Sequence, residues 1–290
     1  MSIVNAKEIM VEAAREQYAI GAFNVTNLVQ MEGVIDAAVD KKSPVILQVS
    51  ARTSKFLGAD VLVAIYRTIA AAAPVPICLH LNHCLEVDYC KKCADAGYTT
   101  IMIDASRECF DENVRRTRAV VDYCHQSGNI SVEGELGMVG GVDDEGRAPD
   151  EAQLANPQQA VDFVEATGLD IFAPAIGTAH GIYKTKNPRV DFERLARINQ
   201  MLNGSTIKTP LVVHGGTGLT EEYIKRLIEA GGAKFNISTE LERTLIDAQY
   251  DYITANRQEY EPGKVDVAIR DAVRKGVGHW IQLLGSAGKA

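Results

Sequence analysis

The chain has 290 residues, of which 46% are hydrophobic and 23% are charged, a balance typical of a soluble enzyme whose core needs no disulfides. Its formal net charge of −8 argues against nucleic acid or an anionic membrane as a partner, so any anionic substrate must be attracted by local features. The mixed-charge N-terminus does not resemble a signal peptide, no apolar run is long enough to span a membrane, and all six cysteines lie between Cys78 and Cys124, as reduced thiols; we therefore expect a cytoplasmic protein.

Short apolar runs alternate with longer helical patterns eight times along the chain. The expected strands are residues 19–23, 44–49, 77–81, 99–103, 130–135, 171–175, 211–214 and 234–237. The helical patterns between them cover residues 31–41, 61–72, 86–96, 113–125, 157–167, 192–201 and 221–230. Eight such units with near-continuous apolar strands favour a closed parallel barrel over an open sheet. We therefore predict an α/β fold, a (β/α)8 TIM barrel that occupies residues 1–290 as one domain.

Two segments depart from this repeat. Residues 137–156 are rich in glycine and acid and follow the fifth strand, so we expect a mobile active-site loop on the face where barrel enzymes keep their chemistry. Residues 240–290 form a C-terminal helical extension, with helical patterns from 240 to about 260 and from 265 to 284. This extension either clamps the bottom of the barrel or builds a subunit interface.

The histidines are the most informative residues. His80 and His83 close the third strand, His180 follows the sixth, and His214 closes the seventh. An isolated histidine is more often structural, but three at strand ends on one barrel face favour a zinc site of His83, His180 and His214. Alternation along the strand places His80 on the same side as Asn82 and one step deeper, which puts His80 inside the barrel.

Acidic residues lie on the same predicted face. Asp104 follows the fourth strand, while Glu133 and Glu135 end the fifth strand and point to the same side of it. Carboxylates near three histidines suggest partners that orient the imidazoles or a second metal position. The alternative for each is a buried acid that is satisfied by a barrel lysine or by backbone amides.

Glycine-rich turns follow the last strands. Barrels often bind phosphate at the ends of strands seven and eight, through backbone N–H groups and a helix N-terminus. Gly215 and Gly216 would let the backbone approach an anion, and Thr217, Ser238 and Thr239 offer hydroxyls. Tight turns need glycine anyway, but the position of these turns beside the histidines favours a phosphate site.

Over nearly its whole length the chain resembles the class II, zinc-dependent fructose-bisphosphate and tagatose-bisphosphate aldolases. The resemblance is specific because several motifs agree in order and spacing. They are GAFNV at 21–25, LHLNHC at 79–84, MIDAS at 102–106, VEGELGMVGG at 132–141, AIGTAHG at 175–181, VHGGTGL at 213–219 and KFNISTEL at 234–241. It implies a homodimeric or homotetrameric lyase of carbohydrate metabolism, such as glycolysis, that cleaves a phosphorylated ketose reversibly to dihydroxyacetone phosphate and an aldehyde.

Matched residue by residue, the resemblance also implies the site. His83, His180 and His214 would bind one catalytic Zn2+, a Lewis acid for the ketose carbonyl, while Asp104 and Glu135 would form an alternative or second divalent metal position. The dihydroxyacetone phosphate half, often assisted by a monovalent cation (Na+ or K+), is assigned to Ser50, Gly181, Lys184, Gly215, Gly216, Thr217, Asn236, Ile237, Ser238 and Thr239.

Three positions depart from the family pattern. Asn82 stands where the family has the aspartate that takes the C4 hydroxyl proton, and an amide cannot accept it. Either a natural divergence has lost or rerouted this base, or the residue was changed deliberately to trap a bound substrate. Because the other site residues are in place, a deliberate change is favoured. Both alternatives imply low turnover with zinc and substrate binding retained. The family's loop acid, which protonates the enediolate, is usually glutamate. The matching position here is Asp143, and Asp144 or Glu145 could substitute for it. Ser238, where fructose enzymes carry an acid or asparagine, favours the tagatose branch.

Arg52 bears on which chemical group the far end of the substrate carries. It lies just beyond the second strand, where a guanidinium could bind a phosphate or a carboxylate, although a surface salt bridge is the alternative. Together with the closing GSAGKA it allows a second interpretation, an aldolase for a phosphorylated deoxy-keto-sugar acid or another anionic-tailed ketose phosphate. A third is a non-catalytic sugar-phosphate-binding protein.

Overall fold

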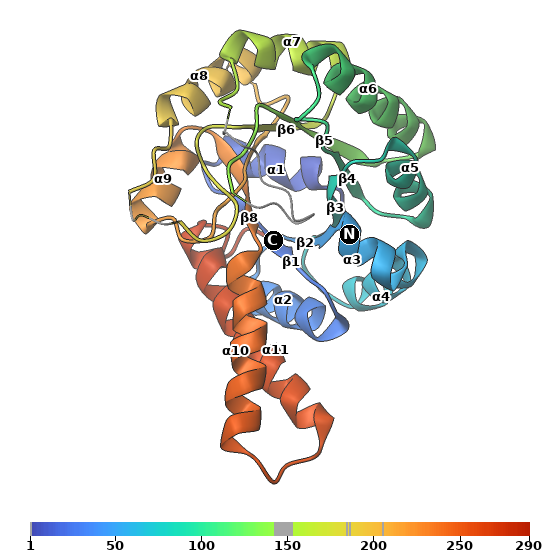
Figure 1. The fold of residues 1–290 in the computed structure, drawn as a ribbon, viewed down its shortest axis with the longest axis vertical. Helices are drawn as coiled ribbons and strands as arrows, with labels where there is room; N and C mark the ends of the chain where they lie inside the picture. Colours follow the sequence, from blue (N-terminus) through green and yellow to red (C-terminus); the bar gives the residue numbers. More distant parts are fainter. Residues whose placement is uncertain (1, 142–152, 184, 186, 205) are drawn as a thin grey trace.

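The computed structural model describes residues 2–141, 153–183, 185, 187–204 and 206–290. Eight parallel strands follow one another around a closed barrel, and the last pairs with the first, which confirms the predicted (β/α)8 architecture (Figure 1). The strands are β1 (Ile20–Asn24), β2 (Val45–Ser50), β3 (Ile77–Cys84), β4 (Thr100–Ile103), β5 (Ser131–Leu136), β6 (Ile171–Pro174), β7 (Leu211–Val213) and β8 (Gly232–Ile237). Seven of the eight lie within two residues of their predicted bounds, and β3 continues three residues further.

Helices surround the barrel as predicted (Figure 1). The surrounding helices are α2 (Leu28–Lys41), α4 (Ala59–Ala71), α5 (Val87–Ala96), α6 (Phe110–Ser127), α7 (Pro157–Thr167), α8 (Phe192–Asn203) and α9 (Glu221–Glu229). Their ends follow the expected capping chemistry: the Thr220 hydroxyl accepts a hydrogen bond from the backbone N–H of Tyr223, and Gly97 and Gly168 end helices in left-handed conformation. The short helix α3 (Ala51–Leu57), directly after β2, was not predicted.

Helix α1 (Ala6–Arg15) closes the N-terminal end of the barrel. Its buried residues Ala6, Met10 and Ala13 pack with the lower interior residues of the strands, such as Ile20 and Ile46, in one apolar cluster. This layer seals one end against water, so polar side chains inside the barrel gather towards the opposite, C-terminal end. No helix in the described ranges is long and apolar enough to cross a membrane.

The C-terminal extension forms two helices, α10 (Thr239–Ala255) and α11 (Pro262–Leu283), in a hairpin that projects beyond the barrel (Figure 1). The part of the hairpin beside α2 is fixed to the barrel wall, because Arg270 of α11 bonds to Asp36 and Glu32 of α2. Gly33 permits this packing, since a Cβ there would lie 2.9 Å from a Val273 side-chain carbon. The extension was expected either to clamp the bottom of the barrel or to build a subunit interface. In the structure α1 closes the bottom and α11 lies along α2 at the side, while the end of α11 reaches the bottom edge, where the Ala19 N–H donates to the Leu284 carbonyl at 3.0 Å. The subunit interface stays a prediction.

Candidate metal centre and phosphate pocket

Two adjacent residues of β3, Asn82 and His83, both line one pocket at the C-terminal end of the barrel. Regular alternation would send them to opposite faces of the sheet. The pairing of β3 with β4 shifts register between Leu81 and Cys84, and His83 has a positive φ of 45°, which non-glycine residues rarely adopt. This irregularity brings both side chains to the same site.

The three histidines singled out from the sequence lie together. Their ring centroids are 5.0 Å apart for His83 and His180, 4.8 Å for His83 and His214, and 5.6 Å for His180 and His214. Each offers a ring nitrogen within 4.8 Å of the others. His83 and His214 are buried, and His180 is half-buried at the pocket. Three converging imidazoles with one accessible side form a set of donors suited to a zinc ion.

The tautomer of His214 is set by a buried carboxylate. Its Nε2 lies 3.1 Å from Oε1 of Glu133, and the other oxygen of Glu133 accepts a 2.9 Å hydrogen bond from Nζ of Lys234; neither the Glu133 nor the Lys234 side chain is exposed to solvent. Burial alone would raise the pKa of Glu133, but the Lys234 charge and the His214 hydrogen bond outweigh it and hold that pKa well below its ordinary value.

Because Nε2 of His214 donates a hydrogen bond to Glu133 and keeps its proton, the lone pair of the neutral ring lies on Nδ1. That atom is 3.1 Å from Oε2 of Glu135, yet the two lack hydrogen-bond geometry, and neither has a hydrogen-bond partner among the described residues. Nδ1 of His214 and Oε2 of Glu135 are thus two buried acceptor atoms close together with no donor between them, an arrangement that suits a bound cation. A histidine that donates one nitrogen's proton to a carboxylate and turns the other inward is the usual arrangement around a bound metal.

A second group of donors shares His83. Nδ1 of His83 lies 3.0 Å from Oδ2 of Asp104, and Asp104 is held in turn by the backbone N–H and hydroxyl of Ser106. His83, Asp104 and Glu135 each offer an atom within 4.8 Å of the others. The structure thus contains two groups of side chains that could each hold a metal ion, and both include His83.

The pocket beside the histidines is lined by residues at or just after the ends of β2, β3, β6, β7 and β8. Its lining residues are Gln48, Asn82, His83, His180, Gly181, Gly215, Thr217, Asn236, Ser238 and Thr239. Gly215 has a φ of 70°, and a Cβ there would come within 2.2 Å of the Ala179 carbonyl oxygen, so only glycine fits. The Thr217 hydroxyl is buried and has no hydrogen-bond partner among the described residues. Thr239 begins α10, whose first N–H groups face this end of the barrel.

Three other predicted site residues, Ser50, Arg52 and Ile237, are not among the residues that line this pocket. Ser50 ends β2 opposite Asn82 in the sheet register, but its hydroxyl caps α3 by accepting from the Thr53 N–H at 3.1 Å. Arg52 lies exposed on α3, and the side chain of Ile237 joins the apolar core, so only its backbone can serve the pocket. Asp143, Asp144, Glu145 and Lys184 lie outside the described residues.

Sequence reasoning did not assign two residues that the structure brings to the site. Gln48 lines the pocket, and its Nε2 donates to Oδ1 of Asn24 at 2.5 Å; the only signal was a polar residue within the apolar run PVILQVS. The Tyr183 hydroxyl accepts from the Ala179 N–H at 3.0 Å and donates to the Gly215 carbonyl at 2.8 Å. It therefore ties the loop that carries His180 to the glycine turn after β7, and no sequence pattern pointed to it.

Comparison with known proteins gives a consistent result. The family described as class-II fructose-bisphosphate aldolase matches residues 4–289. Fructose-bisphosphate aldolase from Geobacillus stearothermophilus is 38% identical, with 100% of this chain and 99% of that protein covered, and the one from Staphylococcus aureus (strain Mu50 / ATCC 700699) is 35% identical with both chains fully covered. Among solved structures, the YdjI aldolase from Escherichia coli K12 is 33% identical with a TM-score of 0.86, covering 99% of each chain. A putative fructose-1,6-bisphosphate aldolase from Coccidioides immitis is 30% identical with a TM-score of 0.87, covering 98% of this chain and 97% of that one.

Proposed function

This chain belongs to the class-II fructose-bisphosphate aldolase family and is a carbon–carbon lyase, and from that premise we propose that it cleaves a ketose bisphosphate reversibly at a zinc centre formed by His83, His180 and His214. The products are dihydroxyacetone phosphate and an aldehyde. The observation that carries the proposal is His214, whose Nε2 is engaged by Glu133 and whose buried Nδ1 faces the other donors. Zinc bound there supplies a Lewis acid that polarises the substrate carbonyl.

The chain's own residues bind the phosphate of the dihydroxyacetone half. Gly215 brings backbone N–H groups close to the pocket, and the hydroxyls of Thr217 and Thr239 can donate to phosphate oxygens. The N-terminus of α10 adds a favourable dipole for the same anion. Because this set lies beside His180 and His83, a phosphate bound there would place the ketose carbonyl next to the three imidazoles.

Asn82 limits the reaction. It is buried beside His83, where the C4 hydroxyl of such a ketose would lie, and its amide can position this hydroxyl but cannot take its proton. We therefore propose a form that binds substrate and metal but turns over slowly. General base catalysis contributes about 10²- to 10⁴-fold in enzymes, so Asn82→Asp should raise kcat by that order.

The test measures zinc content and retro-aldol cleavage of fructose- and tagatose-1,6-bisphosphate by the purified chain and three variants. We expect about one tightly bound zinc per chain. The chain with Asn82 should cleave the sugars slowly, Asn82→Asp should cleave them fast, and Asn82→Ala should show no such increase in rate. His214→Ala should lose zinc and activity together. A zinc-free protein, or an Asn82→Asp variant that binds both sugars but cleaves neither, would contradict the proposal and favour a sugar-phosphate-binding protein. The ratio of the two sugar rates tests whether Ser238 marks the tagatose branch.

We further propose that Arg52 recognises the far end of the substrate. It lies in the first turn of α3, two residues after Ser50. Ser50 in turn pairs with Asn82 across the β2–β3 register. Its guanidinium is exposed and can meet a phosphate or carboxylate that enters past Asn82. In the condensation direction, Arg52→Ala should raise KM for aldehydes with an anionic tail tenfold or more, about 1.4 kcal/mol, and leave neutral aldehydes unaffected. Equal effects on both classes would show that Arg52 has only a structural role.

The remaining functional assignments are also proposals. Asp104 and Glu135, with His83, would hold a second divalent ion, which a titration of the apo-protein should reveal as a second and weaker stoichiometric step. A monovalent cation would assist phosphate binding, which the dependence of KM on Na+ or K+ tests. The whole chain would act as one catalytic unit in a cytoplasmic homo-oligomer, with an acid of the 137–156 loop returning the proton.

A further inference from the structure

The outer wall of the barrel carries a groove where α8 begins beside α9, two helices that are neighbours in Figure 1; we call it the α8–α9 groove. Its volume is about 500 Å³, within the range of cavities that bind small molecules. Arg189 lines it just before α8, Phe192 from the first turn of α8, and Arg226 from α9. None of its lining residues lines the pocket at the histidines, so the groove is separate from the proposed catalytic site.

The charged side chains of this groove carry an excess of positive charge. The Asp191 carboxylate, which also lines the groove, is already paired: it accepts hydrogen bonds from the backbone N–H of Arg194 at 2.9 Å and from its Nε at 3.0 Å. In the described part of the chain, the side chains of Arg189, Glu193 and Arg226 form no hydrogen bond or ion pair. Two guanidinium groups against one carboxylate leave one net positive charge, in a chain whose formal net charge is −8. The groove therefore favours an anion as its ligand.

Arg226 is held in place by an aromatic ring and not by an acid. Its guanidinium carbon lies 3.8 Å from the centre of the Phe192 ring, and the Phe192 ring packs edge-on against Tyr223, with ring centroids 5.2 Å apart. A guanidinium that is attracted to the face of a ring keeps its N–H groups available as donors. Because the contact also restricts the side chain, Arg226 loses less conformational freedom when it binds a ligand.

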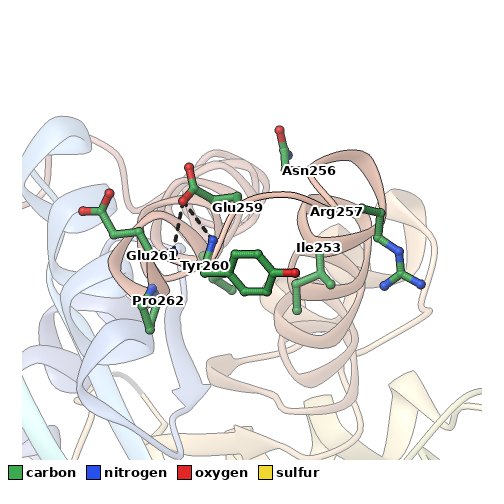
Figure 2. Close-up of a pocket in the computed structure, with 8 residues that line it drawn as sticks. Ile253, Asn256, Arg257, Glu259, Tyr260, Glu261 and Pro262 are labelled. Atoms are coloured by element: carbon green, nitrogen blue, oxygen red, sulfur yellow. Dashed lines mark hydrogen bonds between the residues drawn. The ribbon is translucent and has the colours of Figure 1, made fainter.

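A groove at the tip of the α10–α11 hairpin has a different balance of charge. Its volume is similar, about 560 Å³, and Figure 2 shows the side chains of Arg257, Glu259 and Glu261 around it. Arg257 and Glu261 balance each other in charge, and Glu259 forms an ion pair with Lys264. The tip groove thus has no excess of positive charge, so charge and not size distinguishes the α8–α9 groove.

We propose that the α8–α9 groove binds a small organic anion, a compact carbon skeleton that carries a phosphate or a carboxylate. The N–H groups of Arg189 and Arg226 donate to its oxygens, because a guanidinium can meet an oxyanion with two parallel hydrogen bonds. The skeleton covers Leu154, which is 43% exposed, and Val190, which is half-buried. Burial of this apolar surface adds to the affinity and favours such a ligand over an inorganic ion.

The experiment titrates the full-length chain with phenyl phosphate, benzoate and phenol by isothermal titration calorimetry, with circular dichroism as a check on folding. We expect at least one of the two anions to bind with a dissociation constant of about 1 mM or below, and phenol, which lacks the oxyanion, to bind far more weakly. The tighter of the two anions identifies whether the natural ligand carries a phosphate or a carboxylate. Failure of both anions to bind, or equal binding of phenol, would overturn the proposal.

Charge variants locate the bound anion. Arg226→Gln should weaken its binding roughly tenfold or more, because a charge-assisted hydrogen-bond donor is lost. Glu193→Gln should strengthen the binding, because it removes a like charge from the groove. Arg118→Gln is the matched control, since it removes an exposed arginine from α6, and it should leave the affinity unchanged. An Arg226→Gln variant that binds as tightly as this control would contradict the proposal.

The pocket at the histidines also suits a phosphate, so its contribution is measured separately. Gly215→Ala should weaken binding in that pocket and leave the affinity of the groove, whereas Arg189→Gln, like Arg226→Gln, should do the reverse. Arg189→Gln also keeps the test decisive if Arg226→Gln fails to fold. An anion that Gly215→Ala releases and that neither arginine variant affects is bound only in the pocket, and the proposal would then be wrong.

Discussion

Replacement of Glu133 by glutamine tests how the interior of the barrel supports the metal centre. Glu133 connects two groups: it accepts a hydrogen bond from Lys234 at 2.9 Å, and its second oxygen lies 3.1 Å from Nε2 of His214. Neither Glu133 nor Lys234 is exposed to solvent. The substitution preserves shape but removes the negative charge, so the buried ammonium of Lys234 loses its counter-ion.

The size of the expected loss in folding stability follows from the burial of this ion pair. Removal of one partner from a buried ion pair costs about 3–5 kcal/mol, because the remaining charge stays desolvated. Loss of the carboxylate that orients a metal-binding histidine typically weakens metal binding about 10- to 100-fold. We therefore expect Glu133→Gln to lower the denaturant midpoint of the metal-free protein strongly and also to weaken zinc binding in a competition titration with a chelator.

Two controls separate charge from packing. In the double variant Glu133→Gln with Lys234→Met, no unpaired charge remains, so its apo-form should be more stable than the Glu133→Gln single variant while its zinc affinity stays low. Glu112→Gln removes an acid from an exposed cluster with Arg115 and should change the midpoint little. If Glu133→Gln unfolds at the same midpoint as the natural chain and binds zinc equally well, the proposed support of His214 is wrong.

Because the pKa of Glu133 is lowered in the folded state, the contribution of the Glu133–Lys234 pair to folding stability depends on pH. Its folded-state pKa lies below its unfolded value, owing to the Lys234 charge and the His214 hydrogen bond that outweigh burial, so the unfolded chain binds more protons in that range. The stabilisation is fully present above the unfolded pKa and is lost as the pH falls towards the folded one. The apo-form of the Glu133→Gln, Lys234→Met double variant should therefore lose less stability than the natural chain on acidification, measured as denaturant midpoints from pH 7 downward.

Three further outcomes are expected. Only Cys109 of the six cysteines is exposed, and burial raises the pKa of Cys78 to about 11 and of Cys93 to about 12, so a thiol reagent at neutral pH should titrate one thiol in the native chain and six after denaturation. Gly215→Ala forces a side chain onto a positive φ and against a neighbouring carbonyl, and substrate KM should rise by roughly tenfold or more. Tyr183→Phe removes two hydrogen bonds between loops, which should lower the thermal midpoint and weaken inhibition by inorganic phosphate with the zinc content unchanged; an unaltered phosphate affinity would contradict the positioning role.

The sequence predicts features that depend on local rules. Apolar runs that alternate with helical patterns placed the strands, and in the structure Thr220 caps the start of α9 and Gly168 the end of α7. Three histidines at strand ends were expected to converge, because the carboxyl ends of barrel strands share one face, and the structure brings them together.

Features that depend on long-range packing could not be predicted. Lys234 reaches Glu133 across the barrel interior from β8 to β5, and only the closed geometry makes these two the partners of one ion pair. The course of α11 along α2 is fixed by the bond from Arg270 to Asp36 and by the space left at Gly33. Arg270 lies more than two hundred residues from both of these α2 positions. No local pattern distinguishes that packing from a helix beneath the barrel.

The irregular end of β3 brings the proposed metal ligand His83 and the proposed proton-transfer position Asn82 to one pocket. A regular strand could direct only one of two neighbouring residues into the pocket, but the left-handed backbone at His83 admits both, and the hydrogen bond from Asp104 N–H to the Cys84 carbonyl at 2.8 Å secures that conformation. Under the proposed function, the amide of Asn82 cannot accept the substrate proton while the three imidazoles stay together, so the chain should cleave its substrate slowly and still bind zinc.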